Sequence, residues 1–176
     1  MTAALRMQVP RALLEEVSTR VLRESALVCA RLLPRAPRPL SRWEAMGARL
    51  NFSGSLRGQV EAWIPRPLAA HLAENLLGCG TEEGERNPGL AMTGAAEPVS
   101  DETRLCAMRE LLGILCSSFL SAMGGCETEV RLGRATRCAS LEPLRGGGRA
   151  RELWLEVEGE PMLLRLRLTA SSAPAV

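Results

Sequence analysis

Residues 151–168 read RELWLEVEGEPMLLRLRL, and this stretch decides the fold class. Apolar residues alternate with polar ones along both halves, which is the pattern of two half-buried antiparallel strands joined by a short turn. With a four-residue turn at 159–162, the predicted register places Val157 opposite Leu164 on one side of the hairpin. We therefore expect a hairpin with one dry face and one wet face.

The same period of two recurs in three earlier segments. Residues 48–52 and 60–64 alternate in polarity and are connected through Ser53-Gly54-Ser55, which predicts a second hairpin. A further strand is expected around Val130 and Leu132. Strict alternation indicates a sheet that is solvated on one face and covered on the other. The predicted fold class is α+β, a two-layer domain in which long helices pack on one face of an antiparallel sheet.

Three segments have helical periodicity instead. Apolar residues at spacings of three, four and seven predict a first helix over residues 10–33, which Pro34 ends. Leucines repeat every four residues over 68–76 and predict a second helix, with Gly78 as its C-cap. Ser100 is a candidate N-cap for a long third helix that runs to residue 123.

Length and punctuation favour one domain over residues 1–176. Residues 79–100 are rich in glycine and are expected to form a mobile surface loop. The alanine- and serine-rich end over 170–176 is expected to be frayed.

Composition excludes several classes of function. The 22 basic residues are all arginine and face 20 acidic residues, so the net charge of +2 is too small for a nucleic-acid partner. Six cysteines without a CxxC pair and a single histidine, His71, predict no metal site, and no cofactor motif is present. Early charges prevent an N-terminal signal segment, and the charge-free stretch 111–126 is shorter than the ~20 residues of a membrane span. We expect a cytoplasmic protein with no membrane partner.

The third helix carries the candidate site. At about 100° per residue, one side of it collects the expected core residues, namely Leu105, Met108, Leu112, Leu115, Phe119 and Met123. Glu110 projects nearly opposite, with Gly113 and Ser117 near it; Ile114 is expected to point outward and Leu111 to flank it. A carboxylate among small and aliphatic residues suggests a docking surface for a partner. The alternative is an ordinary surface carboxylate, with Ile114 covered by the long loop or by a second subunit.

Two segments together resemble a known family. These are NFSGSLRGQVEAWIPRPLAAHLAENLLG over 51–78 and DETRLCAMRELLGILCSSFLSAMGG over 101–125. They resemble, respectively, the FxGxxxG hairpin with its following helix and the long helix that carries an ExxN motif in the CheX-type domain of the CheC/CheX/FliY chemotaxis phosphatases. The resemblance implies a role in two-component signalling, namely dephosphorylation of CheY-like response regulators whose metal ion is carried by the regulator itself.

The resemblance also assigns residues. Glu110 corresponds to the motif glutamate, which forms a salt bridge to a lysine of the regulator, whereas the position of the motif asparagine is Gly113. Because the asparagine amide orients the attacking water, glycine at this position implies weakened or lost phosphatase activity.

Three hypotheses follow. In the first, the chain binds a CheY-like receiver domain through Glu110, Ile114 and Ser117, with its phosphatase activity weakened or lost. In the second, it is an active phosphatase with an unconventional water ligand, for which Ser117 is the nearest candidate. In the third, it is a non-catalytic structural module that forms a homodimer through a sheet edge.

Overall fold

The computed structural model describes residues 10–37, 45–54, 56–78, 99–124, 130–141 and 149–169. The elements in chain order are α1 (Arg11–Ser25), β1 (Ala30–Leu32), β2 (Ala45–Gly54), β3 (Arg57–Pro65), α2 (Arg66–Leu77), α3 (Asp101–Gly124), β4 (Val130–Leu132), β5 (Thr136–Cys138), β6 (Arg149–Val157) and β7 (Glu160–Thr169). Most of the expected loop at 79–100, the glycine run at 146–148 and the expected frayed tail at 170–176 lie outside the described residues.

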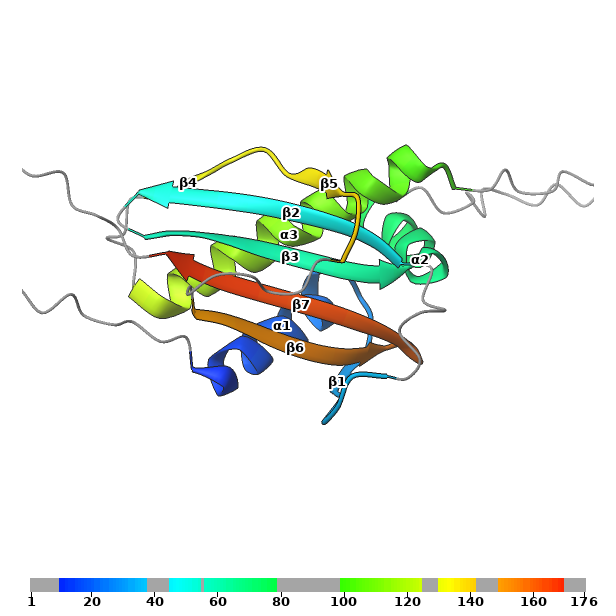
Figure 1. Ribbon diagram of the computed structural model, residues 1–176. Coiled ribbons are helices and arrows are strands. Elements are labelled where there is room, and N and C mark those ends of the chain that lie inside the picture. Colours follow the sequence, from blue (N-terminus) through cyan, green and yellow to red (C-terminus); the bar gives the residue numbers. More distant parts are fainter. Residues whose placement is uncertain are drawn as a thin grey trace, which may run out of the picture.

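The strands form one antiparallel sheet with the helices on one side of it (Figure 1). The strand order is β1-β6-β7-β3-β2-β4, and β5 also pairs with β2. The long α3 packs on α1, α2, β2 and β3. The predicted two-layer α+β architecture is confirmed. The expected hairpin of β2 and β3 is also confirmed, with Leu50 opposite Val60.

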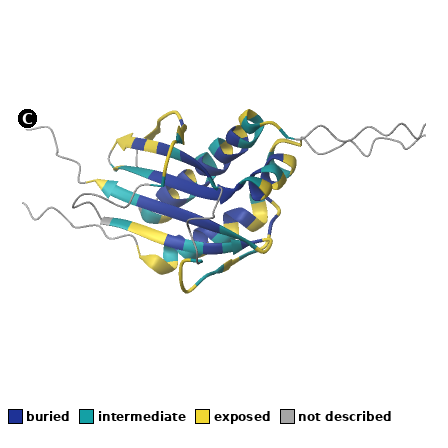
Figure 2. Cartoon of the chain, turned by 45° about the vertical axis from the view of Figure 1, so that its right-hand side comes forward, coloured by how far each residue is buried: buried dark blue, intermediate teal, exposed yellow. Residues whose placement is uncertain are grey.

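The core lies between the three helices and the sheet (Figure 2). The predicted α3 stripe is buried as far as Phe119, and its last member, Met123, is half-buried. By length and composition α3 could cross a membrane, but half of its apolar window is buried inside the fold. A core helix passes the same test, and we interpret α3 as one.

The first helix is shorter than predicted. It ends at Ser25, because Leu27 adopts a left-handed backbone conformation with a φ of 55°. The amide of Val28 then donates to the carbonyl of Leu22 at 3.1 Å, and the chain leaves the helix to form β1. In the sequence, Val28 and Leu32 continue the helical spacing of apolar residues. In the structure they lie beyond the end of the helix, where Val28 is buried and Leu32 is half-buried.

The predicted register of the last hairpin is wrong by four residues. Glu158 and Gly159 form a two-residue turn, with φ values of 50° and 83°, so Val157 lies opposite Glu160 and not Leu164. Leu164 lies opposite Leu153 instead. Because four is an even number, every side chain kept its predicted face of the sheet. Gly78, with a φ of 64°, is the C-cap of α2 as predicted.

The alternation of polar and apolar residues predicted an outer sheet face that is solvated throughout. In the structure, part of this face is buried. A row across β2, β3, β7 and β6 carries alternating charges on Arg49, Glu61, Arg165 and Glu152, each opposite the next. The carboxylate of Glu61 is buried and lies 2.6 Å from Arg49, while Arg165 lies 2.7 Å from Glu152.

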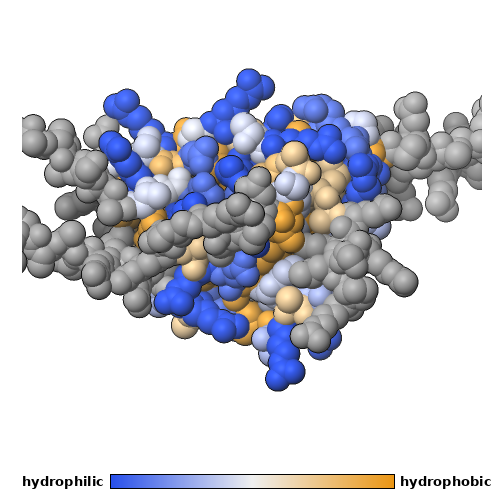
Figure 3. Space-filling model, in the orientation of Figure 1, coloured by the Kyte–Doolittle hydropathy of each residue, from blue (hydrophilic) through white to orange (hydrophobic). Residues whose placement is uncertain are grey.

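A second row next to these charges is apolar. Trp63 covers Gly47 on one side and lies opposite Leu163 on the other, and both large side chains are buried. Figure 3 shows hydrophobic residues gathered between hydrophilic ones on this face. Period-two alternation reports which residues share a face, and it does not report whether a face meets water.

Candidate partner-binding site

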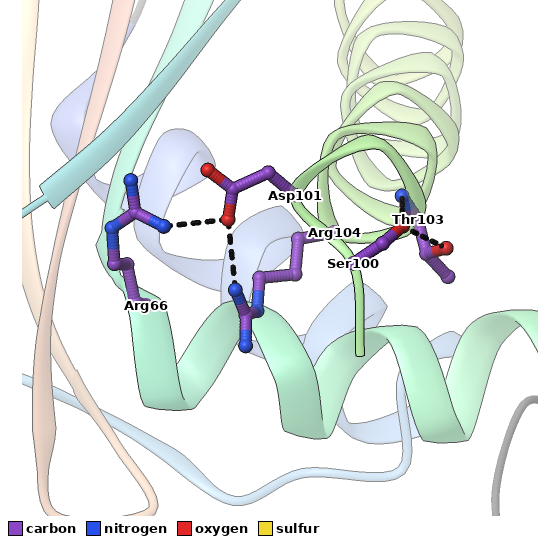
Figure 4. A network of polar contacts seen from close by, with 5 residues as sticks. All are labelled: Arg66, Ser100, Asp101, Thr103 and Arg104. Atoms are coloured by element: carbon purple, nitrogen blue, oxygen red, sulfur yellow. Dashed lines mark hydrogen bonds and ion pairs between the residues drawn. The ribbon is translucent and has the colours of Figure 1, made fainter. Parts of the chain in front are cut away.

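The N-terminus of α3 is fixed by two sets of polar contacts (Figure 4). The Ser100 hydroxyl accepts a hydrogen bond from the Thr103 amide at 3.1 Å, which confirms the predicted N-cap. Asp101 accepts hydrogen bonds from Arg66 at 2.5 Å and from Arg104 at 2.8 Å. These bonds, first that from Arg66 and then that from Arg104, hold the pKa of Asp101 below its ordinary value. The network joins the starts of α2 and α3.

The side of α3 that faces away from the sheet carries few large side chains. Its exposed residues at successive turns include Cys106, Glu110, Ser117 and Ser121. The spacing of three or four residues places them along one stripe with Gly113, which is half-buried. Glu110 is therefore accessible from solvent, as the sequence predicted.

Glu110 differs from the other charged residues of α3 in having no ionic partner. Asp101 pairs with Arg104, and Glu102 pairs with Arg109 at 3.4 Å across two turns. Within the described part of the chain the carboxylate of Glu110 forms no ion pair or hydrogen bond. An exposed carboxylate that the protein leaves without a cation is available to a cation on another molecule.

Gly113 lies one turn after Glu110 and leaves an open space. Apart from its chain neighbours and the backbone of its own helix, no atom of the described residues lies within 4 Å of a Cβ built there. Glycine inside a helix is less favourable than alanine by about 1 kcal/mol. The chain therefore carries a destabilising glycine in α3 at a position where the packing of the described residues does not require it.

Two aliphatic neighbours were placed wrongly from the sequence. Leu111, expected to flank the site on the surface, is fully buried. Ile114, expected to point outward, is half-buried and packs against the core. An apolar face wider than the single predicted stripe explains both errors, because α3 contacts α1, α2 and the sheet. The accessible part of the candidate site is therefore limited to Glu110, Gly113 and Ser117, with Ile114 at its margin.

The site's chemistry is limited to one carboxylate and one hydroxyl. Ser117 is exposed, but four residues separate it from Gly113, which is about 6 Å along the helix axis. No group of three or more metal-ligating side chains occurs among the residues whose positions are described. The buried thiol of Cys116 is inert, because desolvation raises its pKa to about 12.

Two polar residues of α2 lie away from this site. His71 is exposed on α2. Asn75, near the end of α2, donates to the carbonyl of Ala26 at the end of α1, at 2.9 Å. The ion pairs of α3 were not predicted from the sequence, although the Asp101–Arg104 spacing of three residues is a recognisable signal.

No family model matches the sequence, and no curated protein matches it. The fold, however, is similar to solved chemotaxis proteins. Chemotaxis protein CheX from Vibrio vulnificus superposes with a TM-score of 0.62 at 12% identity, covering 96% of this chain and 100% of that one. A chain of the CheX–CheY–BeF3–Mg complex from Borrelia burgdorferi superposes with a TM-score of 0.58 at 14% identity, covering 89% of this chain and 96% of that one. A chemotactic CheC-like protein from Shewanella oneidensis superposes with a TM-score of 0.60 at 9% identity, covering 90% of this chain and 97% of that one. The chain therefore has the fold of the CheX and CheC-like chemotaxis proteins.

Proposed function

We propose that this chain is a cytoplasmic signalling module that binds a CheY-like receiver domain through the exposed side of α3 and does not hydrolyse its aspartyl phosphate. Glu110 supplies the carboxylate that pairs with a cation of the receiver. The observation that carries the proposal is that Glu110 is the one charged residue of α3 without a partner inside the described fold.

Two further facts support a receiver as the partner. The chain shares its fold with CheX, and the similar structure from Borrelia burgdorferi is a complex of CheX with CheY, beryllium fluoride and magnesium. Residues 101–125 resemble the family's long helix, and by that resemblance Glu110 corresponds to the motif glutamate. A carboxylate that stays exposed and unpaired in the free protein fits that role without rearrangement.

The absence of hydrolysis follows from Gly113. To accelerate the attack of water on an aspartyl phosphate, the chain would use a side chain that holds the water in line, and glycine has none. Ser117 is displaced by about 6 Å along the axis and carries a shorter side chain, so it reaches that position only if the receiver docks in a shifted register.

The test uses CheY-like receiver domains from the same organism, each loaded with magnesium and beryllium fluoride as a phosphate mimic. We expect one of them to bind the wild-type chain in calorimetry. Glu110→Arg should weaken that binding at least about tenfold, because it replaces attraction by repulsion. Glu74→Arg, an equal charge change at an exposed site on α2, is the matched control and should leave binding unchanged.

A second measurement follows the decay of the phosphorylated receiver with and without the chain. We expect no acceleration. Acceleration that disappears in Ser117→Ala would show an active phosphatase with an unconventional water ligand. If no receiver binds and the chain forms a dimer that ignores Glu110→Arg but responds to changes at a sheet edge, it is a structural module and the proposal is wrong.

A further inference from the structure

The helices leave the edge strands β4 and β5 accessible on their own side of the sheet. Leu132 of β4 lies opposite Phe52. Arg137 of β5 lies opposite Ala48. Opposed residues of antiparallel strands share a face of the sheet, and both partner residues on β2 belong to the core beneath the helices. Leu132 and Arg137 therefore point to the helix side, yet Leu132 is 42% exposed and Arg137 is also exposed.

The exposed stripe of α3 borders this edge. The flank of α3 that carries Ala107 and Leu111 is buried, and α1 and α2 both pack on α3 from one side (Figure 1). At about 100° per residue, Cys106, Gly113 and Ser117 fall on the other flank of the helix. In Figure 1 strands β4 and β5 lie beyond that other flank. The stripe and the edge strands therefore adjoin each other.

The β4–β5 edge carries positive charge of one sign. Arg134 and Arg137 are exposed, and residues 130–141 include no acidic residue. Neither arginine forms an ion pair with another described residue. The exposed side of α1, by contrast, carries both signs of charge, with Glu16 and Arg20 one turn apart. A basic surface beside an exposed leucine fits a partner that presents acidic and apolar side chains.

A protein partner also needs more area than the stripe of α3 offers. A specific complex buries about 800 Å² on each partner, contributed by about 20–30 residues. The accessible candidate site on α3 is limited to Glu110, Gly113 and Ser117. The interface must therefore extend beyond α3, and the β4–β5 edge is the adjoining surface.

We propose that the β4–β5 edge, with Leu132, Arg134 and Arg137, is a second part of the receiver-binding surface. This inference rests on the proposed function and adds a contact of opposite charge. The receiver presents carboxylates to the two arginines and an apolar side chain to Leu132. Because the α3 site is acidic and the edge is basic, the two contacts together fix the orientation in which the receiver docks.

The first test measures, by calorimetry at low salt, binding of the receiver that binds the wild-type chain in its beryllium fluoride form. We expect Arg137→Glu to weaken binding at least about tenfold and Arg134→Glu to weaken it at least about threefold. Arg20→Glu, the same charge change at an exposed position on α1, is the matched control and should bind like the wild type. The losses should shrink as salt is added, because salt screens exposed charges. Thermal melting of each variant verifies that it is folded.

A photocross-link identifies the molecule that covers the edge. Leu132→p-benzoylphenylalanine, irradiated together with the receiver, should give a product with the combined mass of both proteins. Ala12→p-benzoylphenylalanine, at an exposed position on α1, is the control and should give no such product. A cross-link formed only within the chain would mean that another segment of this chain covers the edge, and the inference would be overturned.

The outcomes separate this inference from the proposed function. If Arg137→Glu binds as tightly as Arg20→Glu, the edge is not part of the interface and the inference is wrong, while receiver binding through Glu110 stands. If no receiver binds, or if Glu110→Arg binds like the wild type, the proposed function fails, and the inference fails with it.

Discussion

Replacing Gly113 by alanine should make this protein more stable. The substitution adds one methyl group, and no atom of the described residues outside the local helix backbone lies within 4 Å of it, so it introduces no clash with them. Alanine is favoured over glycine in a helix interior by about 0.8–1.0 kcal/mol, chiefly because glycine loses more backbone entropy on folding. We expect the free energy of unfolding to rise by about that amount and the melting temperature to rise by about 2–4 °C.

Urea unfolding followed by circular dichroism measures the effect, with the midpoint compared at unchanged slope. Ser117→Ala, at an exposed position on the same stripe, is the control and should give a smaller gain of about 0.5 kcal/mol. A destabilised Gly113→Ala variant would refute the reasoning, because it would mean that the helix needs the glycine for its own packing. A variant that is more stable yet binds its partner more weakly would show that folding and recognition oppose each other at this residue.

Three further changes have expected outcomes. Gly58→Ala should lower the free energy of unfolding by at least about 2 kcal/mol in urea titration, because the new Cβ would overlap the carbonyl oxygen of Arg167. Leu27→Gly should raise it by about 0.5–1 kcal/mol, because a leucine with a φ of 55° and 72% exposure contributes strain and little burial. Asp101→Asn should remove an acid-sensitive part of the stability. The pKa of Asp101 is lowered by Arg66, so its contribution is present above the ordinary value of 3.8 and is lost as the pH falls through the lowered pKa. The urea midpoint of the wild type should therefore fall more than that of Asp101→Asn between about pH 6 and about pH 3; equal falls would contradict this.

The sequence predicted the elements that rest on long periodic patterns. The apolar stripe of α3 from Leu105 to Phe119 repeats over four turns, so the helix would still be predicted if one of its residues were misassigned. The β2–β3 hairpin was equally clear. The end of the first helix could not be predicted, because Val28 fits a helical apolar stripe and also fits a buried position in a loop.

Other features depend on information that periodicity does not contain. The register of the last hairpin is set by the left-handed turn at Glu158 and Gly159, and two turn lengths fitted the same alternation. The sequence could place Glu110 on the surface, since one helix is enough for that. It could not show that Glu102 and Arg109 pair with each other and leave Glu110 unpaired, nor that the space beside Gly113 is open.

The anchoring of α3 determines how it would meet a partner. The helix is capped by Ser100, joined to α2 through Asp101 and packed along its length on two helices and the sheet. A recognition element already held in one shape loses little conformational freedom on association, so the measured affinity would report contact quality and not the cost of ordering. Uncharged substitutions on its exposed stripe should accordingly act mainly on the lifetime of a complex rather than on the rate of encounter.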